Sequence, residues 1–290
     1  MAKIETFSYD ILWNENPSNW NSDASENVFL IEESNWEKKP HPTRSSDNHH
    51  IFNDGKVDIF WKPEDGLNEP FLELLANRLA YSIDGLHVAP TFLAIYNNIV
   101  GIGSVSTSTT TLDSTSYEEF IEWEGNSFVA RHFVFNLWLA NSDWGRKRYD
   151  NSYIVEKNFS GDFIYAYAID FGNTLFCPQG DFKESTIHKL CNNLTFGNDQ
   201  NNNFFGVEIF MKHIQKAFEA ISEIEAKKDS QLYKEALSVA RLLGRYIPNR
   251  QTYYNQLAIA STKVLIERKR KLRKWIIDLY DTILRINYGR

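Results

Sequence analysis

The fold is decided at residues 168–172, which read Ala168-Ile169-Asp170-Phe171-Gly172. They close an apolar, β-prone run that begins at Phe163, and this run follows a second one, Tyr153-Ile154-Val155. The two runs predict a β-hairpin whose second strand ends at the carboxylate of Asp170. A carboxylate at a strand terminus can bind a metal ion that bridges phosphates.

A polar segment at 141–151 precedes the hairpin and follows a strongly apolar helix, which is expected over about residues 127–140. Within this segment, Asp143 could orient an attacking hydroxyl or accept its proton, and Asn151 could ligate Mg²⁺ through its side-chain oxygen. A solvated loop with helix-capping Asn and Asp residues is the alternative for this stretch.

Lys62 ends a β-prone run that pairs with an earlier run across Asn53-Asp54-Gly55, as in a β-hairpin. A buried ammonium needs a partner, and Glu69 and Glu73 lie on the helix expected from about residue 70 to residue 83. A strand lysine paired with a helix glutamate is how kinases hold the α- and β-phosphates of ATP. A surface lysine at a strand end is the alternative.

These residue types follow one another in the order of an ATP-dependent phosphotransfer site: strand Lys, helix Glu, loop Asp, downstream Asn and strand-end Asp. Phosphoryl transfer asks little covalent work of the protein and needs mainly positioning and compensation of phosphate charge. One lysine and two Mg²⁺ ligands supply both. The sequence therefore predicts ATP and Mg²⁺ as the bound cofactors.

With these motifs the chain resembles the HipA-like kinase family, whose fold is related to those of protein kinases and phosphatidylinositol kinases. The resemblance covers roughly residues 50–195 and rests on Phe60-Trp61-Lys62, Glu73-Leu74-Leu75-Ala76, Leu86-His87-Val88-Ala89-Pro90, Gly101-Ile102-Gly103-Ser104, Asn141-Ser142-Asp143, Asn151-Ser152-Tyr153-Ile154-Val155 and Ala168-Ile169-Asp170-Phe171-Gly172. It implies that Lys62 binds ATP phosphates and that Glu73 holds Lys62. It also implies that Asp143 is the catalytic aspartate and that Asn151 and Asp170 are metal ligands.

Three features depart from the kinase pattern. Seven residues lie between Asp143 and Asn151, where protein kinases have four, and Asp143-Trp144-Gly145 stands where the family shows an Asp-Arg-His-like string. No Gly-rich phosphate loop precedes Lys62, and only Gly55 is available there. A serine/threonine protein kinase therefore has two alternatives: an inactive nucleotide-binding pseudokinase or interaction module, and a small-molecule kinase.

The order of elements predicts an α+β protein with a bilobal, kinase-like fold. A β-rich N-terminal lobe over residues 1–97 would form the ATP-phosphate side, and a mostly helical C-terminal lobe over residues 98–290 would carry the catalytic and metal-binding loops. Further strands are expected at 88–95 and 99–105. Helices are expected near 181–194, 205–227, 229–245 and 250–286.

The composition of the chain indicates which classes of binding partner are unlikely. Among 290 residues, 31 Lys and Arg stand against 38 Asp and Glu, and the net charge of −7 makes nucleic acid unlikely as the main partner. No apolar run approaches about 18 residues, so no membrane partner is expected, and no signal peptide is visible, so we expect a cytoplasmic protein. The partner would be a protein or small-molecule hydroxyl acceptor, and the resemblance adds an antitoxin-like regulator.

One strongly basic run reads Glu267-Arg268-Lys269-Arg270-Lys271-Leu272-Arg273-Lys274. Apolar residues beside it recur at helical spacing, which predicts an amphipathic helix with a solvated basic face. A docking site for an acidic partner or nucleic acid is the alternative.

Overall fold

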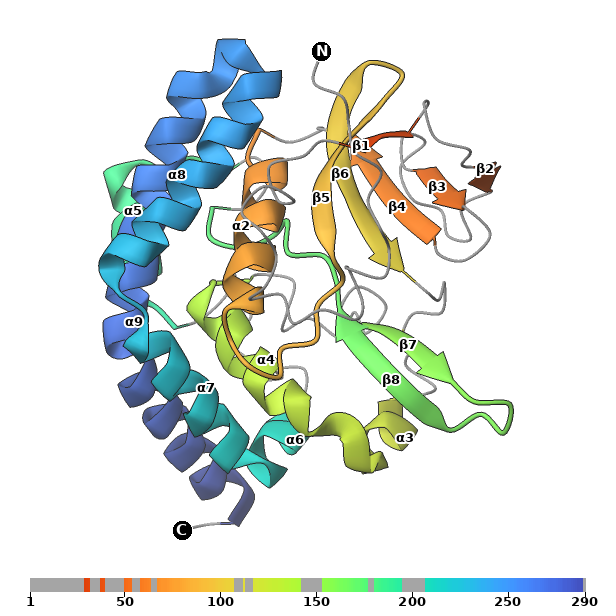
Figure 1. Cartoon of the computed structure of the whole chain (residues 1–290). Helices are drawn as coiled ribbons and strands as arrows, with labels where there is room; N and C mark the ends of the chain where they lie inside the picture. The colour runs from red at the N-terminus through yellow and green to blue at the C-terminus, as the bar shows by residue number, and fades with distance from the viewer. Residues whose placement is uncertain are drawn as a thin grey trace.

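The computed structural model describes residues 29–31, 37–39, 50–53, 58–63, 67–106, 112, 117–141, 153–176, 180–194 and 207–288. Over these ranges a largely antiparallel sheet comes first and a mostly helical C-terminal part follows (Figure 1). The expected combination of β-rich and helical parts is confirmed, while the division into two lobes at residue 97 stays a prediction.

The first sheet contains six strands among the described residues, in the order β1 (Phe29–Leu30), β5 (Thr91–Tyr96), β6 (Ile99–Ser106), β4 (Asp58–Pro63), β3 (His50–Asn53) and β2 (Glu37–Lys39). Five of them pair antiparallel, and β1 pairs parallel with β5. The hairpin expected around Asn53 is confirmed by the pairing of β3 with β4. Because β6 pairs with both β4 and β5, the sheet continues past residue 97 to Ser106.

Strand β4 presents different side chains to its two faces because successive residues of a strand point in opposite directions. Ile59 and Trp61 are buried in a small cluster on one face. Phe60 packs on the other face, against Ala89 and Tyr167. Lys62, two residues after Phe60, shares that second face, so its side chain is directed toward the helical part of the molecule.

Gly101 on β6 faces the end of β4 without a side chain. It pairs with Pro63, and a Cβ at this position would overlap the backbone carbonyl of Lys62 and the indole of Trp61. Glycine is therefore what allows β6 to approach β4 closely beside Lys62.

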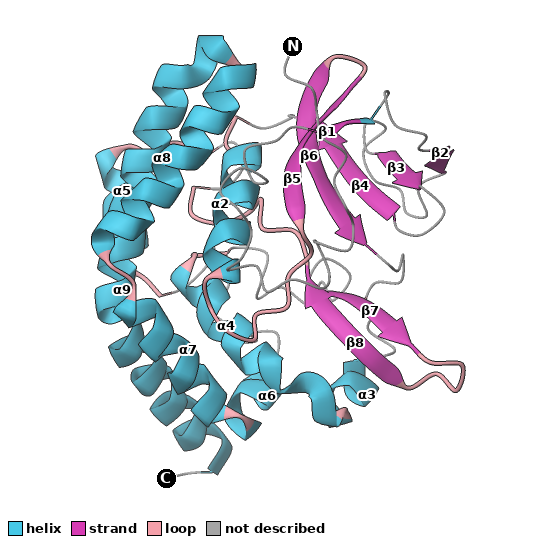
Figure 2. Cartoon of the chain, in the orientation of Figure 1, coloured by secondary structure: helices cyan, strands magenta, loops and turns pink. Residues whose placement is uncertain are grey.

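Helix α2 (Glu69–Tyr81) confirms the helix expected at 70–83. Pro70 lies in its first turn, where the missing N–H has no intrahelical acceptor in any case. Its apolar residues recur at three- and four-residue steps and are buried, among them Phe71, Leu75 and Leu79. The helix lies between the sheet and the C-terminal helices, and it packs against β5, β6 and α8 (Figure 2).

The remaining elements are α3 (Tyr117–Glu122), η4 (Glu124–Ser127), α4 (Phe128–Trp138), β7 (Tyr153–Lys157), β8 (Phe163–Ala168), α5 (Glu184–Asn192), α6 (Val207–Lys212), α7 (Ile214–Ala226), α8 (Asp229–Tyr246), η6 (Pro248–Arg250) and α9 (Gln251–Tyr288). The expected β-hairpin is the pair β7–β8. The expected helix at 205–227 is interrupted at His213, which separates α6 from α7. Every residue of α4 is buried. Among the described helices, none combines the length and apolarity that crossing a membrane requires.

The basic run on α9 does not form a wholly solvated face, because several of its side chains are buried or form ion pairs within the chain. Arg268 is fully buried. Lys269 is buried as well and forms an ion pair with Asp229, with 2.5 Å between Nζ and Oδ1. Arg273 forms an ion pair with Glu225 on α7. These contacts favour a role in packing α9 against its neighbours.

Candidate functional site

Three charged side chains that the sequence singles out meet at one point. The Nζ atom of Lys62 on β4 lies 3.0 Å from Oδ1 of Asp170 and 3.5 Å from Oε1 of Glu73 on α2. Asp170 is 108 residues further along the chain, so the fold itself creates this contact. The side chains of Lys62 and Asp170 remain 27% and 25% exposed, whereas that of Glu73 is only 4% exposed. A solute can therefore reach the lysine and the aspartate, with the glutamate behind them.

Backbone pairing places Asp170 beside α2. The strand end at Ala168 forms a parallel bridge with Val88, in the segment that follows α2. The N–H of Ala168 donates to the carbonyl of His87 at 2.8 Å, and the N–H of Ala89 donates to the carbonyl of Ala168 at 2.9 Å. Two residues later, Asp170 adopts a positive φ of 60°, a region that Asp tolerates better than most residues. Strained backbone of this kind clusters at functional sites.

Glu73 is held from two sides. While Oε1 faces Lys62, Oε2 accepts a hydrogen bond from the backbone N–H of Phe171 at 3.0 Å. Its helix is tied to the sheet by Asn77, whose side-chain amide donates to the carbonyl of Ala89 at 2.7 Å. The glutamate therefore links the lysine strand to the segment that carries Asp170.

Burial and charge act in opposite directions on the two acids. Burial raises the pKa of Glu73 to about 7, although Lys62 pulls it down. Burial also acts to raise the pKa of Asp170, but the ammonium of Lys62 outweighs it and leaves this pKa below its usual value. For Lys62, burial favours a lower pKa and the carboxylates of Asp170 and Glu73 overcome it, so its pKa is raised. Near neutral pH, Lys62 and Asp170 are ionised, and Glu73 is near the midpoint of its titration.

A third acid, Glu69, lies at the same place. Carboxylate oxygens of Glu69, Glu73 and Asp170 lie within 4.8 Å of one another, an arrangement that could hold a metal ion. The i, i+4 spacing of Glu69 and Glu73, which puts both on one side of α2, is the sequence signal for this grouping. Gly172 provides the room, since a Cβ there would lie 3.0 Å from Cγ of Glu69.

Asp143 and Asn151 lie outside the described residues, so their places relative to Lys62 and Asp170 stay predictions. The described residue before their segment, Asn141, is buried. Its side-chain amide donates to Oδ1 of Asn136 at 2.8 Å. The N–H of Leu175 donates to the carbonyl of Leu139 at 2.8 Å, which joins the end of α4 to the chain just after Asp170.

Arg268 on α9 binds the same C-terminal end of α4. Its guanidinium donates to the carbonyls of Leu137 and Trp138 on α4, and to those of Leu190 and Asn193 at the end of α5. Helix C-termini leave such carbonyls without intrahelical partners. The sequence places Arg268 in a basic run and gives no sign of this role, because the acceptors come from distant parts of the chain.

No family model matches the chain, and no curated protein matches its sequence. Among solved structures, similarity is found to the crystal structure of a Helicobacter pylori proinflammatory kinase, CtkA. The TM-score is 0.45 with 16% sequence identity, and the match covers 80% of this chain and 98% of that chain. A likeness of this extent does not assign the chain to a family.

Proposed function

We propose that the chain is a kinase that binds ATP with Mg²⁺ at Lys62 and Asp170 and transfers the γ-phosphoryl group to a hydroxyl acceptor. The observation that carries the proposal is the pairing of the Lys62 ammonium with both Glu73 and Asp170. A strand lysine held by a helix glutamate, next to a strand-end aspartate, is the arrangement that kinases use for phosphates and metal.

Lys62 would bind the phosphates of ATP. An ammonium has three N–H donors, so Lys62 can keep its contact with Glu73 while it donates to a phosphate oxygen. Glu73 would act as the fixed partner that aims the ammonium, because its other oxygen is bound to the N–H of Phe171. Because the side chain of Lys62 is partly exposed, a bound nucleotide can reach its ammonium.

The donor set fits Mg²⁺, which prefers oxygen ligands and is bound by one or two carboxylates together with substrate phosphates. Asp170 would hold the ion, with Asn151 as the further ligand implied by the family resemblance. When bound, the ion would neutralise phosphate charge. Because Asp170 is ionised and a quarter exposed, it can bind a cation without first losing a proton.

Asp143 would orient the acceptor. The acceptor oxygen attacks the γ-phosphorus, the bond from that phosphorus to the β,γ-bridging oxygen breaks, and ADP leaves. The hydroxyl proton passes to the carboxylate of Asp143, and Lys62 compensates charge on the phosphates. A serine or threonine hydroxyl of a protein is the acceptor that we propose, and an antitoxin-like protein is the regulator that the family resemblance implies.

The test compares wild type with Asp170→Asn in the presence of labelled ATP and Mg²⁺, with transfer read as labelled protein and as intact mass. We expect Mg²⁺-ATP to raise the melting temperature of the wild type and label to be transferred, and we expect Asp170→Asn to lose at least about a hundredfold in transfer. Asp278→Asn is the matched control, because Asp278 is exposed on α9 and, among the described residues, its carboxylate pairs with Lys274 one turn earlier. Binding without turnover would identify a pseudokinase, and absence of nucleotide binding by the wild type would refute the proposal.

A further inference from the structure

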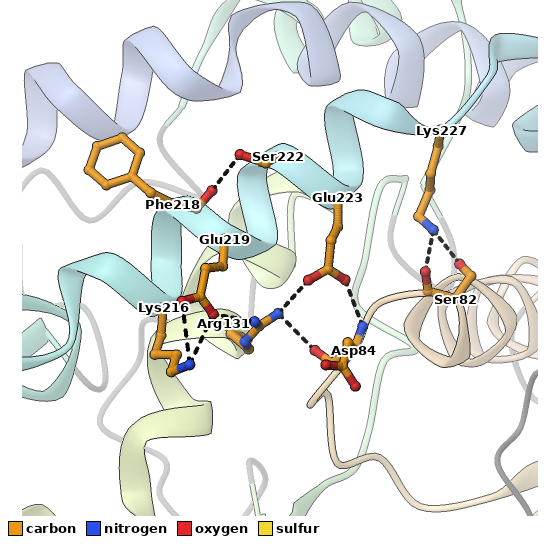
Figure 3. A network of polar contacts seen from close by, with 9 residues as sticks. All are labelled: Ser82, Asp84, Arg131, Lys216, Phe218, Glu219, Ser222, Glu223 and Lys227. Carbon is orange, nitrogen blue, oxygen red and sulfur yellow. Dashed lines mark hydrogen bonds and ion pairs between the residues drawn. The ribbon is translucent and has the colours of Figure 1, made fainter.

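A buried arginine joins the end of α2 to two other helices (Figure 3). Arg131 on α4 is 8% exposed. Its Nη1 atom donates to the backbone carbonyl of Asp84, just after α2, at 2.9 Å and to Oε1 of Glu223 at 2.8 Å, while Nη2 donates to Oε2 of Glu219 at 2.6 Å. Burial acts to lower the pKa of Arg131, but the two glutamates outweigh it and raise it. The charged guanidinium therefore joins α4 to α7 and to the segment just after α2.

Helix α7 contacts the end of α2 directly as well. Oε2 of Glu223 accepts a hydrogen bond from the N–H of Asp84 at 2.7 Å. One turn further, Nζ of Lys227 donates to the carbonyl of Ser82 at 2.6 Å and to its hydroxyl oxygen at 2.7 Å. A cation at the C-terminus of a helix also stabilises the helix dipole. We call Arg131, Glu223 and Lys227 the α2 clamp.

The other parts of α2 are fixed to two further helices, α8 and α9. In its last turns, Nη1 of Arg78 donates to the hydroxyl of Ser238 on α8 at 2.7 Å. At its start, the buried Asn68 donates to the carbonyl of Gly180 at 2.7 Å and accepts from the hydroxyl of Tyr253 on α9 at 2.5 Å. Helix α2 therefore has polar attachments at its beginning, in its last turns and just beyond its end.

We propose that the α2 clamp positions Glu73, so that the pairing of Glu73 with Lys62 is a permanent property of the fold and needs no swing of α2. Ser82 follows Glu73 by nine residues, about 14 Å of helix at 1.5 Å per residue. Because a helix transmits rotation and translation along its axis, an end fixed to α4 and α7 also fixes Glu73. Moving α2 away from α4 and α7 would take the carbonyl of Asp84 from the buried guanidinium. It would also separate Glu223 and Lys227 from Asp84 and Ser82, which is costly. The clamp residues thus act through Glu73 and are positioning residues.

The consequence for nucleotide rests on the proposed function. In protein kinases the position of the glutamate-bearing helix is one of the features that activation controls. In this chain the clamp is built from side chains of the described fold alone, and it requires neither a modified residue nor a partner. We therefore expect the isolated chain to bind Mg²⁺-ATP without prior activation.

The first test does not depend on nucleotide. The N–H of Phe171 is bound to Glu73, so its hydrogen exchange reports the position of Glu73. The N–H of Leu175 is bound to Leu139 instead and serves as an internal reference in the same segment. We expect Arg131→Gln to speed exchange at Phe171 by about tenfold relative to Leu175, and Arg131→Lys to restore part of the protection. A folded Arg131→Gln variant with unchanged exchange at Phe171, or with equal acceleration at both amides, overturns the proposal.

A second variant and a control keep the test decisive. Lys227→Ala removes the bonds to Ser82 and takes the place of Arg131→Gln if that variant does not fold. Arg273→Gln is the matched control, since it removes an ion pair to Glu225 on the same α7 helix and touches no part of α2. We expect exchange at Phe171 to be unchanged in Arg273→Gln. Acceleration there equal to that in Lys227→Ala would overturn the proposal.

The second test connects the clamp to nucleotide through a double-mutant cycle. We expect Arg131→Gln to weaken Mg²⁺-ATP affinity by about three- to tenfold in the wild-type background and to have no effect in a Glu73→Ala background, which lacks the side chain that the clamp positions. Equal loss in both backgrounds would show that the clamp acts by another route and would overturn the proposal. If the wild type binds no nucleotide, the proposed function fails, and exchange at Phe171 still decides whether the clamp positions Glu73.

Discussion

Replacing Glu73 with glutamine tests whether burial or the ion pair with Lys62 has the larger effect on the pKa of Glu73. Glutamine has nearly the same shape and can still accept a hydrogen bond from the N–H of Phe171, but it cannot ionise. Lys62 keeps its closer partner, Asp170, at 3.0 Å. The variant therefore removes one titration and leaves the other contacts of the site in place.

The magnitude follows from the pKa of Glu73, which burial raises from its ordinary 4.5 to about 7. Between these values the folded protein binds more protons than the unfolded chain, so the stability that Glu73 contributes falls as pH rises. At about 1.4 kcal/mol per pH unit, the loss comes to about 3 kcal/mol. The contribution is fully present below pH 4.5 and is lost as pH rises through 7.

The assay is urea unfolding of wild type and Glu73→Gln at a series of pH values. We expect the stability of the wild type relative to the variant to fall by about 3 kcal/mol from pH 4.5 to pH 8, with most of the change between pH 5 and pH 7. Titrating groups remote from the site cancel in the difference, and Lys62 and Asp170 stay ionised over this range because their pKa values lie outside it. A difference that stays constant, or that moves in favour of the wild type as pH rises, would refute the reasoning, because it would mean that Lys62 outweighs burial.

Three further substitutions test how much individual side chains away from Lys62 and Asp170 contribute to the stability of the fold. Ser261→Ala on α9 should raise the free energy of unfolding by about 1 kcal/mol, since its buried hydroxyl has no hydrogen-bond partner among the described residues; a loss of stability in urea unfolding would contradict this. Arg268→Met should lower that free energy by about 3 kcal/mol or more, because four carbonyls, two of them buried, lose their donor. A change under 1 kcal/mol would show that water replaces it. Phe159→Ser should change the melting temperature by no more than the scatter of the measurement, since this side chain is fully exposed and its turn is held by Asn158.

The sequence predicts those parts of the fold that depend on local signals. Pro70 and the three- and four-residue spacing of apolar residues after it are sufficient for α2. The turn residues after Asn53 are sufficient for the hairpin of β3 and β4. The order of Lys62, Glu73 and Asp170 along the chain matches that of a phosphotransfer site, and this match predicts that they meet.

The remaining features depend on partners that are remote in the chain. Arg131 is a single charge in an apolar helix, and nothing nearby indicates that its partner Glu223 lies 92 residues away. Arg268 stands among basic residues and looks like a surface residue until the ends of α4 and α5 are placed around it. Spacing along one helix cannot show which face will be covered by another helix.

The position of α2 between the sheet and the C-terminal helices also has a consequence for how the molecule comes apart. Ten of its thirteen residues are buried, and they are covered by β5 and β6 on one side and by α8 on the other. Neither neighbour can separate from α2 without exposing apolar surface that the other cannot cover. Sheet and helices are therefore expected to melt in one cooperative transition, and a chain cut between them would leave apolar surface exposed on each fragment.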